Sequence, residues 1–241
     1  MIVGDWRSAR VVEVAPATST ARVLHVEVPG WPGSDPGQHV DIRLTAEDGY
    51  QAVRSYSLGS YGSAPTIELA VDEIPDGEVS PYLVRDVLPG DELEVKGPLG
   101  GYFVWRPGGA QPVQLIAGGS GIVPLMAMAR ARTDATADVP FRLLYSVRTP
   151  QDAIYREELG NGIAAGGVDV TWAYTRSAPP EWQGRVGRVD KAALATSVWP
   201  ADRMPVVYVC GPTGFVEHVA DTLVELGHDA RRVKTERFGG A

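Results

Sequence analysis

The sequence predicts two consecutive domains, an N-terminal antiparallel β-barrel over residues 1–106 and a C-terminal doubly wound α/β domain with a parallel sheet over residues 107–241. The first hundred residues hold short apolar, β-branched segments divided by PG, DG and GS turns, which is typical of barrels and sandwiches. After about Pro107, strand-like segments alternate with helical ones, which predicts βαβ units. We expect the boundary in RPGGAQP, at 106–112.

In the first domain, apolar residues recur in short runs bounded by turn residues. These runs predict strands at 11–15, 22–28, 39–44, 55–58 and 66–71. The segment 79–86 predicts a short helix. The turn LPGD then leads into a strand at 92–96.

In the second domain, QPVQLIAGG predicts the first strand of a parallel sheet. Further strands are expected at 141–147, 168–175 and 205–211, helices are expected at 123–132, 152–159, 190–196 and 213–226, and VKTERF closes the chain. Ligands of open parallel sheets bind at the carboxyl ends of the strands. Three such ends, AGGSG, YSVRT and VCGPTG, carry residues suited to binding.

Composition excludes several function classes. The net charge of −8 argues against a nucleic-acid partner, because binding to the phosphate backbone depends on basic residues. The single cysteine rules out an internal disulfide or a cysteine-ligated cluster, and four scattered histidines suggest no metal site. No apolar run reaches the roughly 18 residues of a membrane span. The N-terminus lacks a signal-peptide core, so we expect a cytoplasmic protein, by default a monomer.

The motif AGGSGIVP predicts phosphate binding by Gly118, Gly119, Ser120 and Gly121. Glycines after a strand let the backbone approach a phosphate, and the N-terminus of the following helix presents N–H groups. The third glycine of GxGxxG is missing, so a tight strand–helix turn without a ligand is the alternative.

Three further motifs have both a binding and a structural interpretation. In CGPTGF, Cys210 and Gly211 end a strand, and burial of the thiol is the favoured alternative to a ligand contact. RSYSLGS could hold a phosphate and a ring, or form an amphipathic strand. GEVS could bind an anion at a helix start, or cap that helix.

Loop arginines follow two of the predicted strands and could pair with a monophosphate, or be solvated surface charges. They are Arg148, Arg176 and Arg185.

Taken in order, RSYSLGS, GEVS, GGSGIVP, CGPTGF and ERF resemble the ferredoxin–NADP reductase superfamily of flavoenzymes, over essentially the whole chain. The resemblance implies a flavin-binding barrel and an NAD(P)H-binding α/β domain. It implies an NAD(P)H-dependent reductase that transfers hydride from nicotinamide C4 to flavin N5 and then passes single electrons to a ferredoxin-type carrier or oxygenase component.

The resemblance also assigns roles to individual residues. It places Arg54 at the flavin phosphate, Tyr56 along the isoalloxazine and Ser57 near its N5, with Leu58 beside them. It places the flavin pyrophosphate near three residues of the next motif, Gly77, Val79 and Ser80.

In the second domain the resemblance assigns Gly118–Gly121 to the NAD(P)H pyrophosphate and Cys210 with Gly211 to the nicotinamide. Glu236 and Phe238 match an acid and an aromatic residue near the flavin. The catalytic candidates are therefore Tyr56, Ser57, Cys210 and Glu236.

Two departures and two choices remain. Many relatives carry a basic residue before GxVS, where this chain has Asp72 and Glu73, so we expect no phosphate contact there. One cysteine cannot ligate the iron–sulfur cluster of many relatives, so the acceptor is a separate protein or the chain is part of a larger electron-transfer protein.

GxVSxYL favours FAD over FMN, and the loop arginines favour NADPH over NADH. The alternative activities are reduction of free flavin and a non-catalytic subunit.

Overall fold

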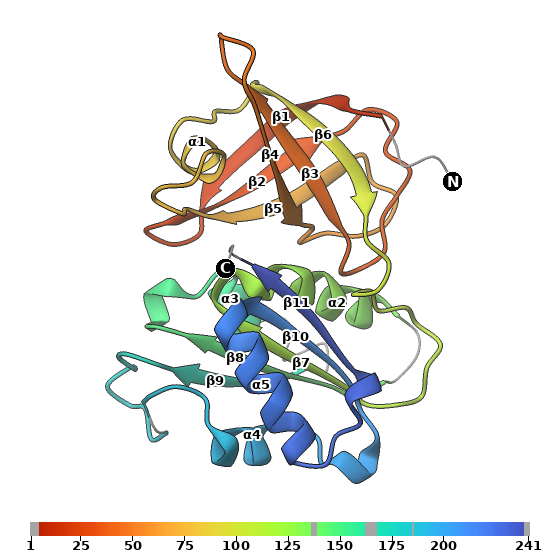
Figure 1. Cartoon of the computed structure of the whole chain (residues 1–241), viewed down its shortest axis with the longest axis vertical. Coiled ribbons are helices and arrows are strands. Elements are labelled where there is room, and N and C mark those ends of the chain that lie inside the picture. Colours follow the sequence, from red (N-terminus) through yellow and green to blue (C-terminus); the bar gives the residue numbers. More distant parts are fainter. Residues whose placement is uncertain (1–4, 136–138, 162–167, 185, 239–241) are drawn as a thin grey trace. The chain divides into compact units, whose positions relative to one another are not determined.

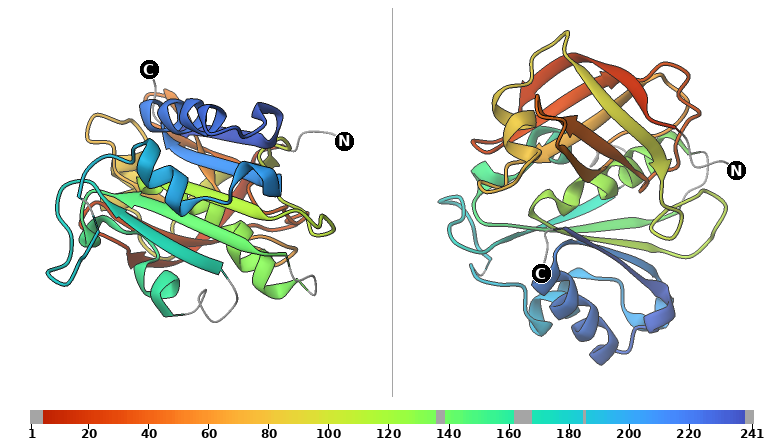
Figure 2. Two further views of the ribbon diagram at one scale, coloured as in Figure 1. Left: turned by 90° about the horizontal axis from the view of Figure 1, so that it is seen from below. Right: turned by 45° about the horizontal axis from the view of Figure 1, so that its top comes forward.

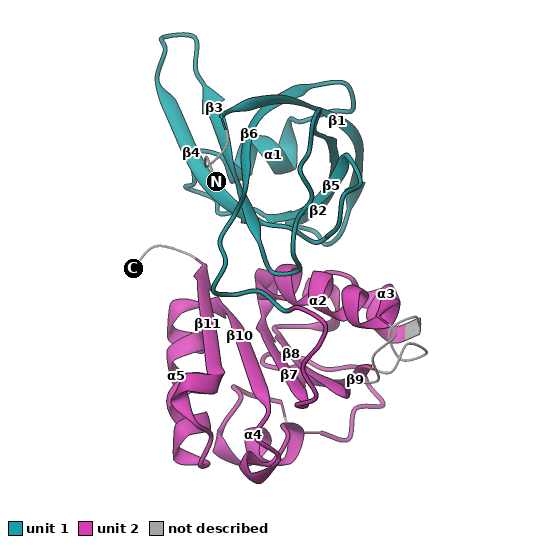
Figure 3. Cartoon of the chain, turned by 90° about the vertical axis from the view of Figure 1, so that its right-hand side faces the viewer, with its two compact units in different colours: residues 1–105 teal, residues 106–241 magenta. Residues whose placement is uncertain are grey.

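A computed structural model of the chain (Figure 1) describes residues 5–135, 139–161, 168–184 and 186–238. The chain divides into two compact units, Met1–Trp105 and Arg106–Ala241 (Figure 3). The first unit contains one antiparallel sheet and the second one parallel sheet, which confirms the predicted fold class. Each unit is described by itself.

The first unit is a six-stranded antiparallel sheet in the order β4-β3-β6-β1-β2-β5. Its elements are β1 (Arg7–Pro16), β2 (Ala21–Glu27), β3 (His39–Thr45), β4 (Gln51–Ser57), β5 (Thr66–Asp72), α1 (Ser80–Arg85) and β6 (Glu92–Leu99). The two outer strands meet just past the end of β4, where Leu58 bridges Leu69 and the N–H of Gly59 donates to the carbonyl of Glu68 at 2.9 Å. The sheet therefore curls into a barrel.

Strand β4 begins four residues before the predicted 55–58 segment. Asp48 and Gly49 form the turn of a hairpin, and the Ala46 N–H donates to the Tyr50 carbonyl at 2.9 Å. Pairing then continues from Thr45↔Gln51 to His39↔Ser57. The hairpin extends the strand over Gln51–Arg54, which has too few apolar residues to predict it.

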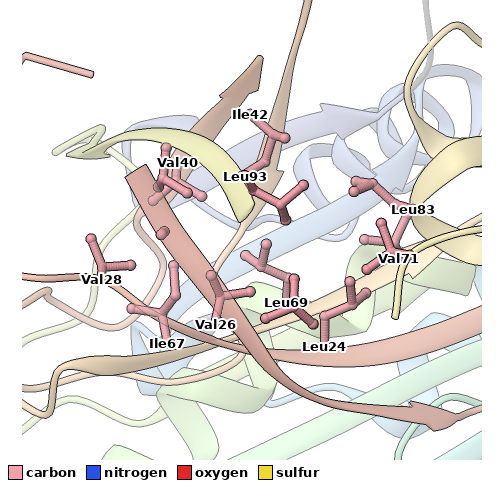
Figure 4. Close-up of a cluster of buried hydrophobic side chains, with 14 of the residues drawn as sticks. Leu24, Val26, Val28, Val40, Ile42, Ile67, Leu69, Val71, Leu83 and Leu93 are labelled. Carbon is pink, nitrogen blue, oxygen red and sulfur yellow. The ribbon is translucent and has the colours of Figure 1, made fainter. Parts of the chain in front are cut away.

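The barrel encloses an apolar core (Figure 4). The strands β2, β3 and β5 contribute alternate side chains, as period-two geometry requires. The labelled members are at most 2% exposed: Leu24, Val26, Val28, Val40, Ile42, Ile67, Leu69, Val71, Leu83 and Leu93. Leu83 comes from α1, so the short helix is packed onto the barrel by its apolar face. Burial of each leucine contributes roughly 1.5–3 kcal/mol.

The second unit is a five-stranded parallel sheet in the order β11-β10-β7-β8-β9. Its strands are β7 (Val113–Gly118), β8 (Phe141–Val147), β9 (Val168–Tyr174), β10 (Val206–Pro212) and β11 (Val233–Phe238), and its helices are α2 (Ile122–Asp134), α3 (Arg156–Asn161), α4 (Lys191–Ser197) and α5 (Thr213–Glu225). Figure 2 shows α2 and α3 on one face and α4 and α5 on the other. The strand order reverses between β7 and β10, which makes their carboxyl ends the expected ligand site of a doubly wound sheet.

The segment predicted as one helix at 152–159 is divided. A 3₁₀ turn at Pro150–Asp152 precedes α3, which begins only at Arg156. The Thr149 hydroxyl donates to the Asp152 carboxylate at 2.7 Å, and Tyr155 has a left-handed backbone with φ of 60°. A continuous helix cannot accommodate that conformation, so the prediction was wrong for this segment.

Two features are absent from the described residues. No helix in them is long and apolar enough to cross a membrane. No group of three His, Cys, Asp or Glu side chains in them could hold a metal ion.

The turn between β7 and α2 touches the end of β10 backbone to backbone. A Cβ atom on Gly121 would lie 2.6 Å from the Gly211 nitrogen and closer still to the Cys210 carbonyl. A Cβ on Gly211, whose φ is +154°, would lie 2.9 Å from the Gly118 carbonyl. Both positions therefore require glycine, and the contact fixes where α2 begins.

We expect Gly121→Ala to destabilise the protein by about 3 kcal/mol or more, because the new methyl group meets backbone atoms that belong to a packed sheet. Urea unfolding measures the change in free energy. Gly214→Ala is the matched control, because a Cβ there meets no atom within 4 Å and alanine favours a helix. Equal stability of the two variants would contradict this account of the turn.

Candidate functional site

Strand β4 and the residue that follows it carry four candidates of different character. The Arg54 side chain is 51% exposed, Tyr56 is partly buried against the barrel core, and Ser57 and Leu58 are buried. Burial raises the pKa of the Tyr56 phenol, and the Arg54 charge offsets only part of that rise. Tyr56 is therefore a neutral ring with a hydroxyl group. The strand places a cation, an aromatic ring and a serine within four residues.

Arg54 pairs with a carboxylate that the sequence analysis missed. Its guanidinium forms an ion pair with Glu78, and its Nη1 donates to the Val53 carbonyl at 2.8 Å. The Tyr50 hydroxyl donates to the other Glu78 oxygen at 2.6 Å. The hydrogen bond from Tyr50 and, after it, the charge and hydrogen bond of Arg54 lower the pKa of Glu78. The residue lies inside the GEVS motif, but nothing in the sequence relates it to Arg54, 24 positions earlier.

The rest of GEVS forms a tight loop before α1. The Gly77 N–H donates to the Ile74 carbonyl at 2.8 Å, and the Ser80 hydroxyl oxygen accepts from the Ile74 N–H at 3.0 Å. A Cβ on Gly77 would lie 3.0 Å from Ser80 Oγ. Val79 is fully buried. The structure thus brings Gly77, Val79 and Ser80 together, with the Ser80 hydroxyl already hydrogen-bonded inside the loop.

The acidic residues that replace the basic residue of many relatives lie at the end of β5. Glu73 pairs with Arg85 of α1, whose Nε donates to it at 2.9 Å. That bond lowers the pKa of Glu73. Asp72 accepts from the Thr20 hydroxyl at 2.8 Å. Both carboxylates therefore serve contacts within the barrel unit.

In the second unit, Gly118 ends β7 and Gly119–Gly121 form a 3₁₀ turn that leads directly into α2. Gly118 packs against the Phe215 ring, where a Cβ would lie 2.7 Å from Cδ1. No side chain caps the start of α2. The Ile122 N–H donates to the Gly119 carbonyl within the turn, and Pro124 has no N–H, but the N-terminus of a helix still attracts anions through its dipole. The turn carries only the small Ser120 side chain, and this combination of glycines and a hydroxyl suits an anion such as a pyrophosphate.

The end of β10 holds the buried thiol. Cys210 has no exposed surface, which confirms the favoured prediction of burial. Burial and, secondarily, the Glu236 charge raise the pKa of this thiol. Across the parallel pair, Cys210 lies opposite Glu236 and Pro212 lies opposite Phe238. The structure therefore brings Cys210, Gly211, Glu236 and Phe238 to one end of two neighbouring strands.

Arg148 and Arg176 follow the neighbouring strands β8 and β9 and are both exposed. The Arg176 N–H donates to the Arg148 carbonyl at 2.9 Å, so the two loops run side by side. Arg185 lies outside the described residues. The two described arginines can approach one anion from adjacent loops.

A cluster of three aromatic residues beside these loops was also missed in the sequence analysis. The rings of Trp172 and Tyr174 are stacked at 6.2 Å, and Trp182 meets Tyr174 edge to face at 5.0 Å. Trp172 and Tyr174 are two residues apart on β9, a spacing that puts them on one face. The two-residue spacing of Trp172 and Tyr174 could have predicted that pair from the sequence. The contact of Trp182 with Tyr174 depends on the folded loop and could not.

Two family models match the chain. Residues 11–104 match the oxidoreductase FAD-binding domain, and residues 115–221 match the oxidoreductase NAD-binding domain. The first match falls within the barrel unit and the second within the parallel-sheet unit.

Relatives agree with both matches. The chain is 32% identical to ferredoxin–NADP reductase B of Sorangium cellulosum over 247 residues, covering 99% of this chain and 100% of that protein. It is 33% identical to the glycine betaine monooxygenase reductase subunit of Chromohalobacter salexigens over 208 residues, covering 85% of this chain and 56% of that protein. The chain thus spans only about half the length of that relative.

A solved structure shares the fold of both units. The FAD/NAD-binding domain of nitric oxide dioxygenase from Vibrio cholerae superposes with a TM-score of 0.85 at 26% identity, covering 98% of this chain and 100% of that one. These findings confirm the resemblance that the ordered motifs indicated. The chain belongs to the ferredoxin–NADP reductase-like family of FAD-dependent NAD(P)H oxidoreductases.

Proposed function

We propose that the chain is an NAD(P)H-dependent reductase that takes hydride onto FAD and delivers single electrons to a separate acceptor protein. One observation carries the proposal. The FAD-binding family model falls within the barrel unit, and the NAD-binding family model falls within the parallel-sheet unit. The relative from C. salexigens is the reductase subunit of a monooxygenase, which supports an oxygenase component or ferredoxin as the acceptor.

In the barrel unit, Arg54 supplies the positive charge for a flavin phosphate. Tyr56 offers a neutral, partly buried ring beside the isoalloxazine, and Ser57 offers a hydroxyl near N5. Gly77, Val79 and Ser80 shape the loop for the pyrophosphate. Bound FAD supplies the chemistry that side chains lack, acceptance of a hydride and release of electrons one at a time.

In the second unit, the backbone N–H groups of Gly118–Gly121 hold the pyrophosphate of NAD(P)H, and Arg148 with Arg176 hold the 2′-phosphate of NADPH. Cys210 stays a neutral thiol because burial raises its pKa. It therefore packs beside the nicotinamide without adding a negative charge. Glu236, its neighbour across the sheet, provides the carboxylate of the site.

A reductase that releases reduced free flavin is the second candidate. The exposure of the Arg54–Glu78 pair favours it, because a flavin phosphate has to displace a carboxylate at a solvated position. Such an enzyme would lose its flavin during purification and turn over added flavin.

An absorbance spectrum of the purified protein, followed by anaerobic titration with NADPH and then NADH, tests the proposal. A yellow protein that one nicotinamide bleaches supports the reductase. A colourless protein that shows no flavin spectrum after FAD is added would reject the assignment of RSYSLGS and the activity with it. A colourless protein that oxidises NAD(P)H only with excess flavin would establish the second candidate.

We expect Arg148→Ala to raise KM for NADPH about tenfold and KM for NADH less than twofold, because a charge-assisted bond to a phosphate is worth roughly 1.5–3 kcal/mol. Steady-state kinetics with a dye acceptor measures both constants. Arg231→Ala is the control, since Arg231 is 90% exposed and precedes β11, at the opposite edge of the sheet. An equal rise for the two nicotinamides would reject this role for Arg148.

We expect iodoacetamide to label Cys210 in the native protein at less than a hundredth of the rate in urea, because the thiol is buried and its raised pKa leaves little thiolate at pH 8. As the only cysteine, it gives an unambiguous signal by mass spectrometry. The native rate should stay low between pH 7 and 9, since titration lies above that window. Rapid native labelling that follows an ordinary thiol titration would show that Cys210 is accessible as a thiolate.

A further inference from the structure

Three side chains of the barrel unit form one polar group, Tyr50, Arg54 and Glu78. Both Glu78 oxygens are engaged, one by the Arg54 guanidinium and the other by the Tyr50 hydroxyl at 2.6 Å. Arg54 is 51% exposed and Glu78 44% exposed, so both reach solvent. Tyr50 comes from the hairpin after β3, and Glu78 from the loop before α1. One loop thus supplies the carboxylate that pairs with Arg54, and a second loop supplies the hydroxyl that fixes this carboxylate in place.

Glu78 is an internal anion at the position where the flavin phosphate is proposed to bind. A phosphate that pairs with Arg54 has to displace the carboxylate or share the guanidinium with it. In either case the arginine and the glutamate together carry no net charge. The negative charge of the glutamate therefore weakens the attraction between the guanidinium and the phosphate.

The two common flavins differ in the phosphate that they present. FMN ends in a phosphate monoester, which carries about −1.5 to −2 at pH 7, as phosphorylated side chains do. Each phosphate of FAD has one ester link and one anhydride link, so it carries one negative charge. A carboxylate beside the binding arginine therefore repels the FMN phosphate more strongly than either FAD phosphate.

We propose that Glu78 is a specificity-determining residue that selects FAD over FMN by competing for Arg54. The inference rests on the proposed flavin-binding function and adds the residue that decides which flavin is bound. Tyr50 is the positioning partner, because its hydrogen bond holds the carboxylate where it faces the guanidinium.

The chain offers a matched control in the same unit. Glu94 pairs with Arg43 through two hydrogen bonds, at 2.9 and 2.5 Å, and its side chain is 40% exposed. Glu94→Gln removes the same charge from a similar arginine pair on β3 and β6 that includes no proposed flavin contact. It reports the general effect of one fewer negative charge on the barrel unit.

The experiment is a fluorescence titration of FAD and of FMN into the flavin-free protein, for the wild type, E78Q and E94Q. We expect E78Q to lower Kd for both flavins, and Kd for FMN by roughly threefold to fivefold more, the size of a unit-charge interaction at a solvated site. E94Q should leave the ratio of the two constants unchanged. An unchanged ratio in E78Q, or the same change in E94Q, would overturn the proposal.

The titration distinguishes an error in this inference from an error in the proposed function. A wild type that binds neither flavin rejects both, whereas a wild type that binds FAD with a ratio insensitive to Glu78 rejects only the inference. Glu78→Ala is titrated alongside, with circular dichroism as a check of folding, so that the result does not depend on one variant. Tyr50→Phe should shift the ratio in the same direction as E78Q but less, because Arg54 still holds the carboxylate.

Discussion

The contact that the rest of the second unit depends on is the one between the β7–α2 turn and the end of β10. Gly121 lies against the backbone of Cys210 and Gly211, with no room for a side chain on either glycine. Because β7 and β10 are the strands where the sheet order reverses, this contact sits at the topological switch point. It aims the uncapped start of α2 at the carboxyl edge of the sheet, and it packs Cys210 out of solvent. One steric constraint therefore sets both the position of the glycine turn, where we propose that a phosphate binds, and the environment of the thiol.

The barrel unit places its candidates by an analogous closure. The bridge from Leu58 to Leu69 joins the two outer strands directly after Ser57. The residues just before the bridge differ in exposure. Tyr56 packs partly on the core, while Arg54 points to solvent and meets Glu78. Arg54, Tyr56 and Ser57 therefore lie at the end of the strand where the barrel closes, and Gly118–Gly121 and Cys210 lie where the order of the parallel sheet reverses.

Local pattern was sufficient for most elements and for several site residues. The alternation of strands and helices after Pro107, the glycine turn and the burial of Cys210 follow from short-range chemistry, and the structure confirms them. Features that depend on tertiary contacts could not be predicted. The Arg54–Glu78 pair joins residues 24 positions apart, β4 is extended by hairpin pairing rather than by apolar residues, and Trp182 reaches Tyr174 only through the folded loop. The left-handed Tyr155 divides a segment whose composition is helical.

Under the proposed function, the two units hold phosphates by different physics. The glycine turn offers backbone N–H groups in fixed positions, and their strength depends on geometry rather than on a neighbouring charge. The barrel unit depends on one guanidinium, in a chain whose net charge is −8 and which carries Asp72 at the end of β5, with Glu73 and Glu78 before α1. Glu73 is occupied by Arg85, which leaves Glu78 as the acid that faces Arg54. A site built on a single exposed charge can be tuned by one carboxylate, whereas a site built on backbone dipoles cannot. This contrast explains why flavin selectivity would reside in Glu78, the one GEVS residue to which the resemblance assigned no role.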